Sequence, residues 1–440
     1  MQNVNGERIL EGAPDIIGTR REKLVNMRKQ VGAYLPRELS GLAKAAGELA
    51  AARGEKLYLV GGAVRDLFLG RRNLDLDLVV EGDAPSLARQ FAKGKGGKVV
   101  AHARFGTATV TLGDVSLDMV TARSETYAEP GALPSVKPGT IKDDLFRRDF
   151  TVNAMAVRLE PASFGELVDH YGGKSDLDKG LIRILHKASF RDDPTRIWRA
   201  VRYEKRLGFR LESETERLLR RDLAMMDKVS GDRLRHELER IFEEDSPEKA
   251  LRRADELGAL RQLHESLKAD GWMVKRFEEA RRSNDGSKPE PSLYLALLVW
   301  RLKEEELETV MGRLKFGGEA ARVLRGMPNI KRAMYELGSP GIMPSEIYRL
   351  LEHHQPQGIR AAALATDSGL VRVSLELYLF DLRFVVPVLT GDELKRMGVP
   401  EGRRLGWMLR TLRNAKLDGE VTTREAEEAL VWQWLSKGKS

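Results

Sequence analysis

The stretch LYLVGGAVRDLFLGRRNLDLDLVV, residues 57–80, decides the fold expected for this chain. Its first part, Leu57–Val60, is a short apolar run that predicts a buried strand. Gly61 and Gly62 then predict a turn into a helix, and their backbone N–H groups are candidates to bind a triphosphate. Arg65 follows one helical turn later and is a candidate to clamp phosphate oxygens. A strand-to-helix turn without any ligand also fits the glycine pair.

The second part of the stretch, Leu74–Val80, predicts a strand that carries an Asp-x-Asp pattern. Side chains alternate between the two faces of a strand, so Asp75 and Asp77 share one face. Two neighbouring carboxylates repel each other unless a divalent cation lies between them, and such cations suit nucleotidyl transfer. We therefore predict Asp75 and Asp77 as metal ligands. A solvated strand face is the alternative.

Two further motifs follow in the chain, RRDFTVNAM at residues 147–155 and DDPTRIWRAVRY at residues 192–203. Together with the stretch at 57–80, and in the same order, they resemble the motifs of the class II bacterial tRNA nucleotidyltransferases and poly(A) polymerases, a branch of the polymerase-β-like nucleotidyltransferases. The resemblance covers about residues 55–210 and continues more weakly towards the C-terminus. It implies an α+β fold, with a mixed β-sheet in a nucleotidyltransferase head followed by an all-α C-terminal half.

The resemblance also implies two-metal catalysis with Mg²⁺. Many polymerase-β-like folds add a third carboxylate from a neighbouring strand, and Asp118 in the run Val115–Val120 is the candidate here. Asp75, Asp77 and Asp118 are thus the predicted catalytic residues. A strand-face aspartate without a catalytic role is the alternative for Asp118.

The motif RRDFTVNAM contacts the ribose and the phosphates of the incoming nucleotide in the family. By their chemistry, Asn153 could hydrogen-bond a ribose hydroxyl, and Arg148 could pair with a phosphate or brace the site. The alternative is an arginine–aspartate network that only ties strand to helix, which fits Asp149 equally well.

The step Asp193-Pro194 predicts a helix start, with Asp193 as the N-cap and Pro194 at the first helical position. In the family, the residues matching Asp193 and Arg196 read the base edge of the incoming nucleotide. A carboxylate accepts from the exocyclic amine that C and A share, and a guanidinium donates to the ring, which would select CTP and ATP. Asp192 stands where glutamate is commoner, so the shorter side chain puts the bracing of Arg196 in doubt.

Four arginines recur at helical spacing after this step, and they lie roughly along one helix face: Arg196, Arg199, Arg202 and Arg206. We predict Arg196, Arg199 and Arg202 as nucleotide-binding residues, with a phosphate-facing stripe as the physical reason. A solvated face with ion pairs one helical turn apart is the alternative.

The composition is mildly basic: the 440 residues include 74 lysine or arginine and 66 aspartate or glutamate, a net charge of +8. This permits nucleic acid binding, and the length indicates several domains.

The absence of cysteine excludes disulfides and cysteine-ligated zinc and permits a reducing compartment. Met1–Gly6 has no apolar run and Leu293–Trp300 is too short to cross a bilayer, so we expect no secretory signal, no membrane contact and a cytoplasmic location.

We expect the following domains: an N-terminal helical lead at 1–54, the catalytic head at 55–160, a helical neck with the base-reading motif at 161–225, an RNA-binding body at 226–337 and a tRNA-binding tail at 338–440. Runs within the head predict strands at Leu57–Val60, Leu74–Val80, Lys98–His102, Thr107–Leu112, Val115–Thr121 and Thr151–Leu159. Residues 124–140 are rich in proline and glycine and predict a mobile loop, although an ordered connection also fits. In the family, such a loop helps the switch from C to A addition.

The function expected from these motifs is addition of C, A or CCA to the 3′ end of tRNA, with CTP and ATP as substrates. The nearest rival is a bacterial poly(A) polymerase, but Ala103-Arg104-Phe105-Gly106 stands where we would expect Gly-Arg-Arg-Phe. A non-catalytic RNA-binding protein on the same fold is the alternative from another class. The sequence leaves open the oligomeric state and the choice between full CCA addition and one part of it.

Overall fold

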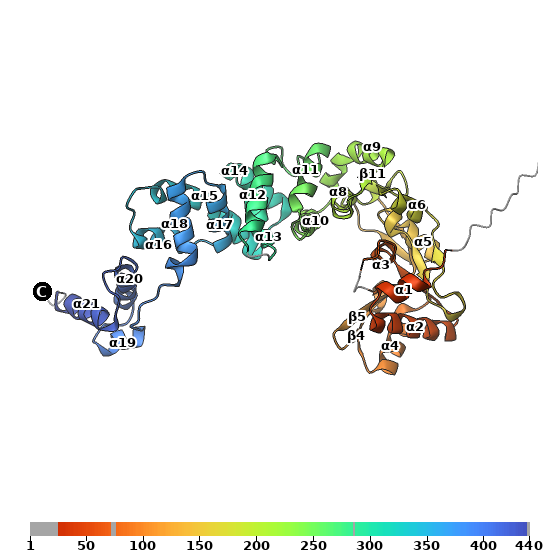
Figure 1. Ribbon diagram of the computed structural model, residues 1–440, viewed down its shortest axis with the longest axis horizontal. Helices are drawn as coiled ribbons and strands as arrows, with labels where there is room; N and C mark the ends of the chain where they lie inside the picture. Colours follow the sequence, from red (N-terminus) through yellow and green to blue (C-terminus); the bar gives the residue numbers. More distant parts are fainter. Residues whose placement is uncertain (1–24, 72–75, 285–286, 438–440) are drawn as a thin grey trace, which may run out of the picture. The chain divides into compact units, whose positions relative to one another are not determined.

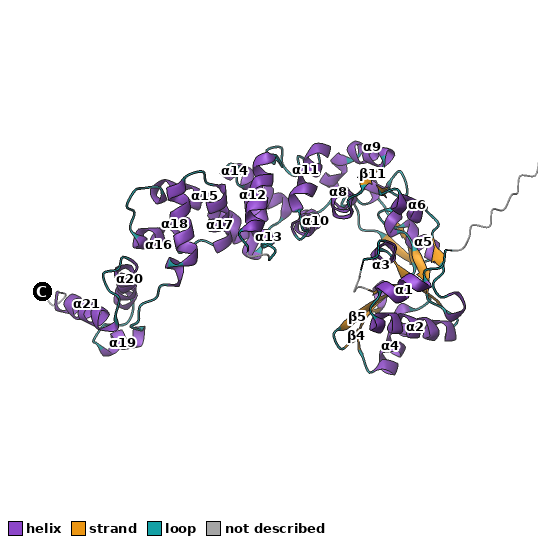
Figure 2. Cartoon of the chain, viewed as in Figure 1, coloured by secondary structure: helices purple, strands orange, loops and turns teal. Residues whose placement is uncertain are grey.

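The computed structural model describes residues 25–71, 76–284 and 287–437. It divides into two compact units, which are described separately below. Of the described residues, 25–71, 76–125 and 136–177 belong to the first unit, and 126–135, 178–284 and 287–437 belong to the second. Strands gather in the first unit, whereas the second is almost entirely helical (Figures 1 and 2). This confirms the predicted α+β class.

A seven-stranded mixed sheet forms the centre of the first unit, in the order β3-β4-β5-β2-β1-β8-β9. Its strands are β1 (Lys56–Val60), β2 (Leu76–Glu81), β3 (Lys98–His102), β4 (Thr107–Leu112), β5 (Val115–Thr121), β8 (Ala156–Arg158) and β9 (Leu167–Val168). β2 and β5 pair in parallel, whereas the other neighbours pair antiparallel. A parallel pair needs a crossover connection, and residues 82–114 supply it with α4, β3 and β4.

Helices cover this sheet. They are α1 (Arg28–Tyr34), α2 (Arg37–Ala52), α3 (Gly62–Phe68), α4 (Ala84–Lys95), α5 (Ile141–Phe146) and α6 (Gly173–Asp178), with short 3₁₀ turns η1 (Ala103–Phe105), η2 (Thr151–Asn153) and η3 (Pro161–Ser163). α2 packs on β1, and α4 packs on β3, β4 and β5. The side chains of Leu57–Val60 are all buried, which explains why β1 is apolar at every position rather than at alternate ones.

The strand predicted over Thr151–Leu159 is wrong at its start. Residues 151–153 form η2, and only Ala156–Arg158 pair in the sheet. Thr151 Oγ1 donates to Asp176 Oδ2 at 2.7 Å, and Asn153 Nδ2 donates to Asp149 Oδ1 at 3.0 Å. Side-chain hydrogen bonds of this kind compete with a strand ladder and favour a turn.

The region 124–140 contains two short strands, β6 (Arg123–Thr126) and β7 (Ser135–Pro138), which pair with each other. The expected loop is therefore an ordered ribbon at its base. Its outer part, residues 126–135, belongs to the second unit.

The second unit consists of helices, with one short parallel pair of strands, β10 (Leu181–Ile182) and β11 (Arg210–Leu211). The helices before residue 300 are α7 (Ser189–Asp192), α8 (Arg196–Leu207), α9 (Ser213–Arg221), α10 (Gly231–Phe242), α11 (Pro247–Leu257), α12 (Gly271–Arg282) and α13 (Pro291–Val299). Those after it are α14 (Glu304–Leu314), α15 (Gly318–Leu337), α16 (Pro344–Leu351), α17 (Pro356–Ala365), α18 (Gly369–Phe380), α19 (Gly391–Arg396), α20 (Arg403–Leu417) and α21 (Arg424–Lys437). The 3₁₀ turns η4 (Leu223–Lys228) and η5 (Leu382–Phe384) lie between helices.

No helix within the described ranges is both long and apolar enough to cross a membrane.

Two glycines inside α2 test how tightly this helix packs on the sheet. A Cβ at Gly47 would lie 2.0 Å from the carbonyl oxygen of Leu159, whereas a Cβ at Gly41 would meet nothing within 4 Å. We expect Gly47→Ala to lower the free energy of unfolding by about 1–3 kcal/mol, because the helix must move away from the strand end. Gly41→Ala should raise it by up to about 1 kcal/mol through helix propensity. Urea denaturation of both variants is the measurement, and equal effects would contradict this packing.

Candidate active site

Two carboxylates meet on the exposed face of the sheet. Asp77 on β2 and Asp118 on β5 are partners in the parallel register, and both residues are exposed. Partners in a parallel pair share a face, while the neighbouring Leu76 and Leu117 are buried on the other. The sequence analysis proposed Asp118 as a third catalytic carboxylate only by analogy with related folds. The pairing of β2 with β5 places it beside Asp77. Asp75 lies outside the described residues.

Asp118 is oriented from the next strand. Thr109 on β4 is its antiparallel partner, and Thr109 Oγ1 donates to Asp118 Oδ1 at 2.6 Å. Carboxylate oxygens are the ligands that Mg²⁺ prefers, so the pair of Asp77 and Asp118 fits such an ion. The described part of the chain contains no cluster of three or more potential metal ligands.

The glycine turn lies beside an arginine. Gly61 has a φ of +71°, which disfavours any side chain, and a Cβ there would lie 2.7 Å from Nη1 of Arg148. The expectation of two bare N–H groups is wrong for Gly61, because its N–H donates to the carbonyl oxygen of Met155 at 3.2 Å. Gly62 begins α3, where the first N–H groups have no partner inside the helix.

A buried aspartate holds Arg148 in this position. Asp144 is fully buried; its Oδ2 accepts from Arg148 Nη2 at 2.9 Å, and its Oδ1 accepts from Arg147 at 2.7 and 2.9 Å. Burial alone would raise the pKa of Asp144, but the two guanidinium groups outweigh it and the pKa lies below its ordinary value. The carboxylate therefore stays ionised and anchors both arginines.

Arg65 and Asn153 belong to a second buried network. Arg65 Nη1 donates to Asn153 Oδ1 at 2.6 Å, and its Nε donates to Asp66 at 2.9 Å. Asn153 in turn donates to Asp149, which also accepts from the backbone N–H of Phe150. Arg65 is only 3% exposed. These bonds connect α3 to η2. For Asn153 they suit the bracing network that the sequence left as an alternative to a ribose contact, and for Arg65 they suit a structural role better than a phosphate clamp.

In the second unit, Asp193 uses one carboxylate oxygen for structure. Oδ1 accepts from the N–H and the hydroxyl of Thr195, at 3.1 and 2.6 Å, and from Arg233 Nη2 at 2.8 Å. The described residues place no hydrogen-bond donor on Oδ2. The helix α8 begins at Arg196, two residues later than predicted, with Thr195 rather than Asp193 as its N-cap. Arg233 follows 40 residues later in the chain, and no sequence signal indicated it.

Arg196 lies beside this aspartate in the chain and is nearly buried. Its Nη1 donates to Ser189 Oγ at 2.7 Å. The neighbouring His186 has a pKa below its ordinary value, because of burial and of the charge of Arg196, which Asp192 only partly offsets. A neutral imidazole leaves the guanidinium as the local positive charge.

Two arginines of the α8 stripe pair with acids of α10 and the residues that follow it, whereas Arg206 at the end of the stripe is exposed. Arg199 Nη1 lies 3.5 Å from Glu237 on α10, and Arg202 lies 3.7 Å from Glu237 and 3.5 Å from Glu244. Arg202 is buried, so the alternative of a solvated face is wrong there. The ion pairs tie α8 to α10, and phosphate binding by Arg199 and Arg202 stays a prediction.

The outer part of the 124–140 ribbon contacts helices of its own unit. The N–H of Gly131 donates to the carbonyl oxygen of Arg191 at 3.1 Å, and Arg233 Nη1 donates to the carbonyl oxygen of Gly131 at 3.3 Å. Arg233 thus contacts both the ribbon and Asp193.

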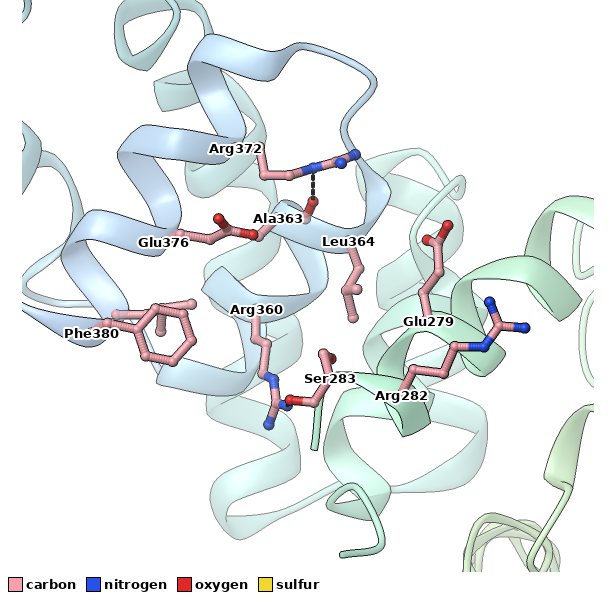
Figure 3. A pocket seen from close by; sticks show the side chains of 10 residues that line it. Glu279, Arg282, Ser283, Arg360, Ala363, Leu364, Arg372, Glu376 and Phe380 are labelled. Carbon is pink, nitrogen blue, oxygen red and sulfur yellow. Dashed lines mark hydrogen bonds between the residues drawn. The ribbon is translucent and has the colours of Figure 1, made fainter. Parts of the chain in front are cut away.

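A cavity of about 440 Å³ lies between α12, α17 and α18 in the same unit (Figure 3). Two of its guanidinium groups fix the surrounding backbone: Arg372 Nε donates to the carbonyl oxygen of Ala363 at 3.2 Å, and Arg360 donates to that of Ser283 at 3.1 Å. The described residues that line it include none that the sequence singled out.

Two protein-family models match the chain. The model of the poly A polymerase head domain matches residues 57–183, and the model of a probable RNA- and SrmB-binding site of polymerase A matches residues 208–270.

Similar proteins include two A-adding tRNA nucleotidyltransferases. That of Halalkalibacterium halodurans is 36% identical over 81% of this chain and 84% of its own length. That of Geobacter sulfurreducens is 34% identical over 96% of this chain, and the chain spans 50% of its length. Among solved structures, the Thermotoga maritima CCA-adding enzyme complexed with tRNA is 32% identical, with a TM-score of 0.72, over 94% of this chain and 99% of that one.

The anchor at Asp144 gives a prediction for stability. We expect Asp144→Asn to lower the free energy of unfolding at pH 7 by about 3 kcal/mol, because two guanidinium groups lose a buried counter-charge. The folded-state pKa of Asp144 is depressed, so its stabilisation is present above the unfolded pKa of about 4 and is lost as the pH falls through the folded pKa. Wild-type stability should therefore drop more steeply below pH 4 than that of the variant.

Urea denaturation between pH 7 and pH 3 measures this difference. Asp143→Asn at the neighbouring, exposed position is the matched control and should cost only about 1 kcal/mol, from the capping box of α5. Equal losses in the two variants would contradict the anchoring role of Asp144.

Proposed function

This chain belongs to the family of tRNA nucleotidyltransferases and poly(A) polymerases, and we propose that it adds nucleotides from ATP or CTP to the 3′ end of tRNA. The observation that carries the proposal is the parallel register of Asp77 and Asp118 on an exposed sheet face. Oxygen ligands fixed on neighbouring strands suit the divalent metals that this family generally uses.

We take Mg²⁺ as the metal, with Asp75, Asp77 and Asp118 as its ligands. When bound, Mg²⁺ would neutralise charge on the α-phosphate and favour ionisation of the attacking 3′-hydroxyl. In the transfer, the 3′-hydroxyl of the RNA loses its proton to solvent, its oxygen bonds to the α-phosphorus, and the bond from that phosphorus to pyrophosphate breaks. Thr109 contributes by fixing the rotamer of Asp118, because its hydroxyl occupies Oδ1.

The glycine turn and Arg148 form the part of the first unit proposed to bind the triphosphate. Arg148 keeps its Nη1 beside Gly61 while its Nη2 is held by Asp144, so the guanidinium is already oriented. An oriented guanidinium loses little freedom when it binds a phosphate. Gly62 offers a backbone N–H at the start of α3. The buried hydrogen bond from Arg65 to Asn153 connects this helix to η2 and so helps to fix the position of the turn.

Base selection is proposed for Asp193 and Arg196 in the second unit. The three donors on Oδ1 fix the carboxylate of Asp193, which leaves Oδ2 to accept from the exocyclic amine of cytosine or adenine. Arg196 can donate to a ring nitrogen or carbonyl of the same base. Selection then follows from hydrogen-bond polarity, because uracil and guanine present a carbonyl where the amine would be.

Addition of A to a tRNA that already ends in CC is the finer reaction we propose. It is supported by the two A-adding relatives, which match 81% and 96% of the chain at 36% and 34% identity. Complete CCA addition is the alternative. It is supported by the likeness to the Thermotoga maritima CCA-adding enzyme, which covers 94% of this chain and 99% of that one. A cytoplasmic location and the helical domain boundaries stay predictions.

The transfer experiment uses tRNA transcripts that end at the discriminator base, at C or at CC, each with Mg²⁺ and labelled ATP or CTP. We expect one A on the CC end, and growth of the discriminator end to CCA would instead identify a complete enzyme. Long A tails on any RNA would make the chain a poly(A) polymerase, and no incorporation with retained tRNA binding would make it a binding protein.

The carboxylate variant Asp118→Asn belongs in the same assay. It should lower the rate more than about 100-fold without changing the unfolding midpoint, because this exposed residue adds charge but little packing. Asp114→Asn, on the exposed turn before β5, is the matched control and should keep wild-type rates. Wild-type activity of Asp118→Asn would remove this residue from the metal site.

Asp193→Asn tests base selection. The donors on Oδ1 still require an acceptor there, so the new amide NH₂ must take the position of Oδ2 and offer a donor to the base. We expect kcat/KM for GTP relative to ATP, and for UTP relative to CTP, to rise at least about tenfold. Asp227→Asn, an exposed acid of the same unit, should leave both ratios unchanged. Unchanged ratios in Asp193→Asn would refute the base-reading role.

A further inference from the structure

A second cavity lies at one end of the sheet in the first unit. Its volume is about 400 Å³, within the usual range for small-molecule sites. The start of α4, the turn η1, the end of β5 and the base of the β6–β7 ribbon line it. Every residue that lines it belongs to the first unit.

This cavity is separate from the carboxylate face. Thr121 lines the cavity and lies three residues beyond Asp118 on β5, so the two side chains point to opposite faces of the sheet. The N–H of Ala84 at the start of α4 donates to Thr121 Oγ1 at 3.2 Å, which confirms that Thr121 faces this helix. The distance along the strand is roughly 10 Å at about 3.3 Å per residue.

The lining is strongly cationic. Four basic residues from four different elements contribute to it: Arg89, Arg104, Arg123 and Lys137. Only Arg123 has a carboxylate partner among the described residues, with its Nη2 at 3.2 Å from Glu125. A cluster of basic side chains with little counter-charge creates a positive potential that attracts anions.

The lining contains one acidic residue, and its side chain caps a helix. Asp83 is the N-cap of α4, and its Oδ1 accepts from the N–H of Ser86 at 3.0 Å. Gly82, Asp83 and Pro85 together place the amino end of this twelve-residue helix at the cavity, and the positive end of the helix dipole adds to the arginine charge. The carboxylate of Asp83 keeps its charge and offsets part of this potential, but four basic side chains against one acid leave an excess of positive charge that favours an anion.

An aromatic ring stands beside these charges. Phe105 lines the cavity and is 58% exposed, so its ring is accessible to a ligand there. The guanidinium carbon of Arg104 lies 5.9 Å from the centre of its ring. Exposed aromatic rings beside arginines are the stacking surfaces on which proteins bind unpaired bases.

We propose that this cavity is a second nucleotide site, in which Arg89, Arg104 and Lys137 bind a phosphate and Phe105 stacks on the base. The shared chemistry is a phosphorylated nucleoside, and the source is either a free nucleoside triphosphate or a nucleotide unit of an RNA strand. The inference goes beyond the proposed function, because it requires binding but no transfer at this site.

Photo-crosslinking of the full chain locates the ligand directly and does not depend on catalysis. Two probes are used without Mg²⁺, 8-azido-ATP and a tetraribonucleotide that contains 4-thiouridine, and the cross-linked peptides are mapped by mass spectrometry. We expect cross-links in the peptide that contains Phe105, falling at least about tenfold in the double variant Arg89→Ala/Arg104→Ala. Higher salt should weaken both cross-links, because each probe is held by its phosphate charge.

The matched control removes two exposed charges from the other end of the same helix. Lys93→Ala/Lys95→Ala should cross-link like the wild type, because neither lysine lines the cavity. Circular dichroism and the unfolding midpoint establish that both double variants fold, and Lys137→Ala repeats the test from a different element.

The two probes distinguish the source of the nucleotide. Cross-linking at Phe105 by 8-azido-ATP identifies a free nucleotide, and cross-linking by the tetraribonucleotide alone identifies an RNA strand. No cross-link at this peptide with either probe, or undiminished cross-linking in Arg89→Ala/Arg104→Ala, would overturn the proposal. Because no incorporation is measured, these outcomes are independent of whether the chain transfers nucleotides to tRNA.

Discussion

The parallel pairing of β2 with β5 is the constraint on which the proposed chemistry depends. It sets Asp77 opposite Asp118 at the centre of the sheet, where apolar neighbours such as Leu76 and Leu117 fill the opposite face. Sliding one strand by a single residue would bury a carboxylate and expose a leucine, so hydrophobic packing fixes the register. The cost of two like charges on adjacent strands is then accepted because a divalent cation can offset it.

Buried polar networks fix the other proposed site residues of the first unit. Asp144 orients Arg148 towards the glycine turn, and Arg65 connects α3 to Asn153 and Asp149. Such networks add little net stability, because burying their charges costs about as much as pairing gains. Their contribution is to fix the positions of Arg148 and of the glycine turn, which we propose to bind a triphosphate. In the second unit, Arg233 helps to orient Asp193 by donating a hydrogen bond to its Oδ1.

The local sequence pattern predicted most strands of the head, because apolar runs are a local property. The Asp-x-Asp spacing likewise predicted that Asp77 lies on the face of a strand opposite to that of its apolar neighbours. The pattern failed where side chains distant in the sequence decide the backbone, as at Thr151, which donates to Asp176 of α6, and at Asn153, which accepts from Arg65 of α3. The pattern also could not predict that Arg202 is buried, because helical spacing does not show that Glu237 and Glu244 lie opposite this side chain. Arg233 and Thr109 gave no signal, because their roles arise only from tertiary contact.

The most direct test of the central claim is whether a metal ion held by these carboxylates contacts the α-phosphate. Single-turnover addition to tRNA is measured with the α-thio analogue of the preferred nucleotide, in Mg²⁺ and in Mn²⁺. We predict slow addition of one thio isomer in Mg²⁺ and recovery in Mn²⁺, because sulfur is a poor ligand for Mg²⁺ and a better one for the softer ion. Equal rates in both ions, or addition after chelation of all divalent metal, would contradict the account.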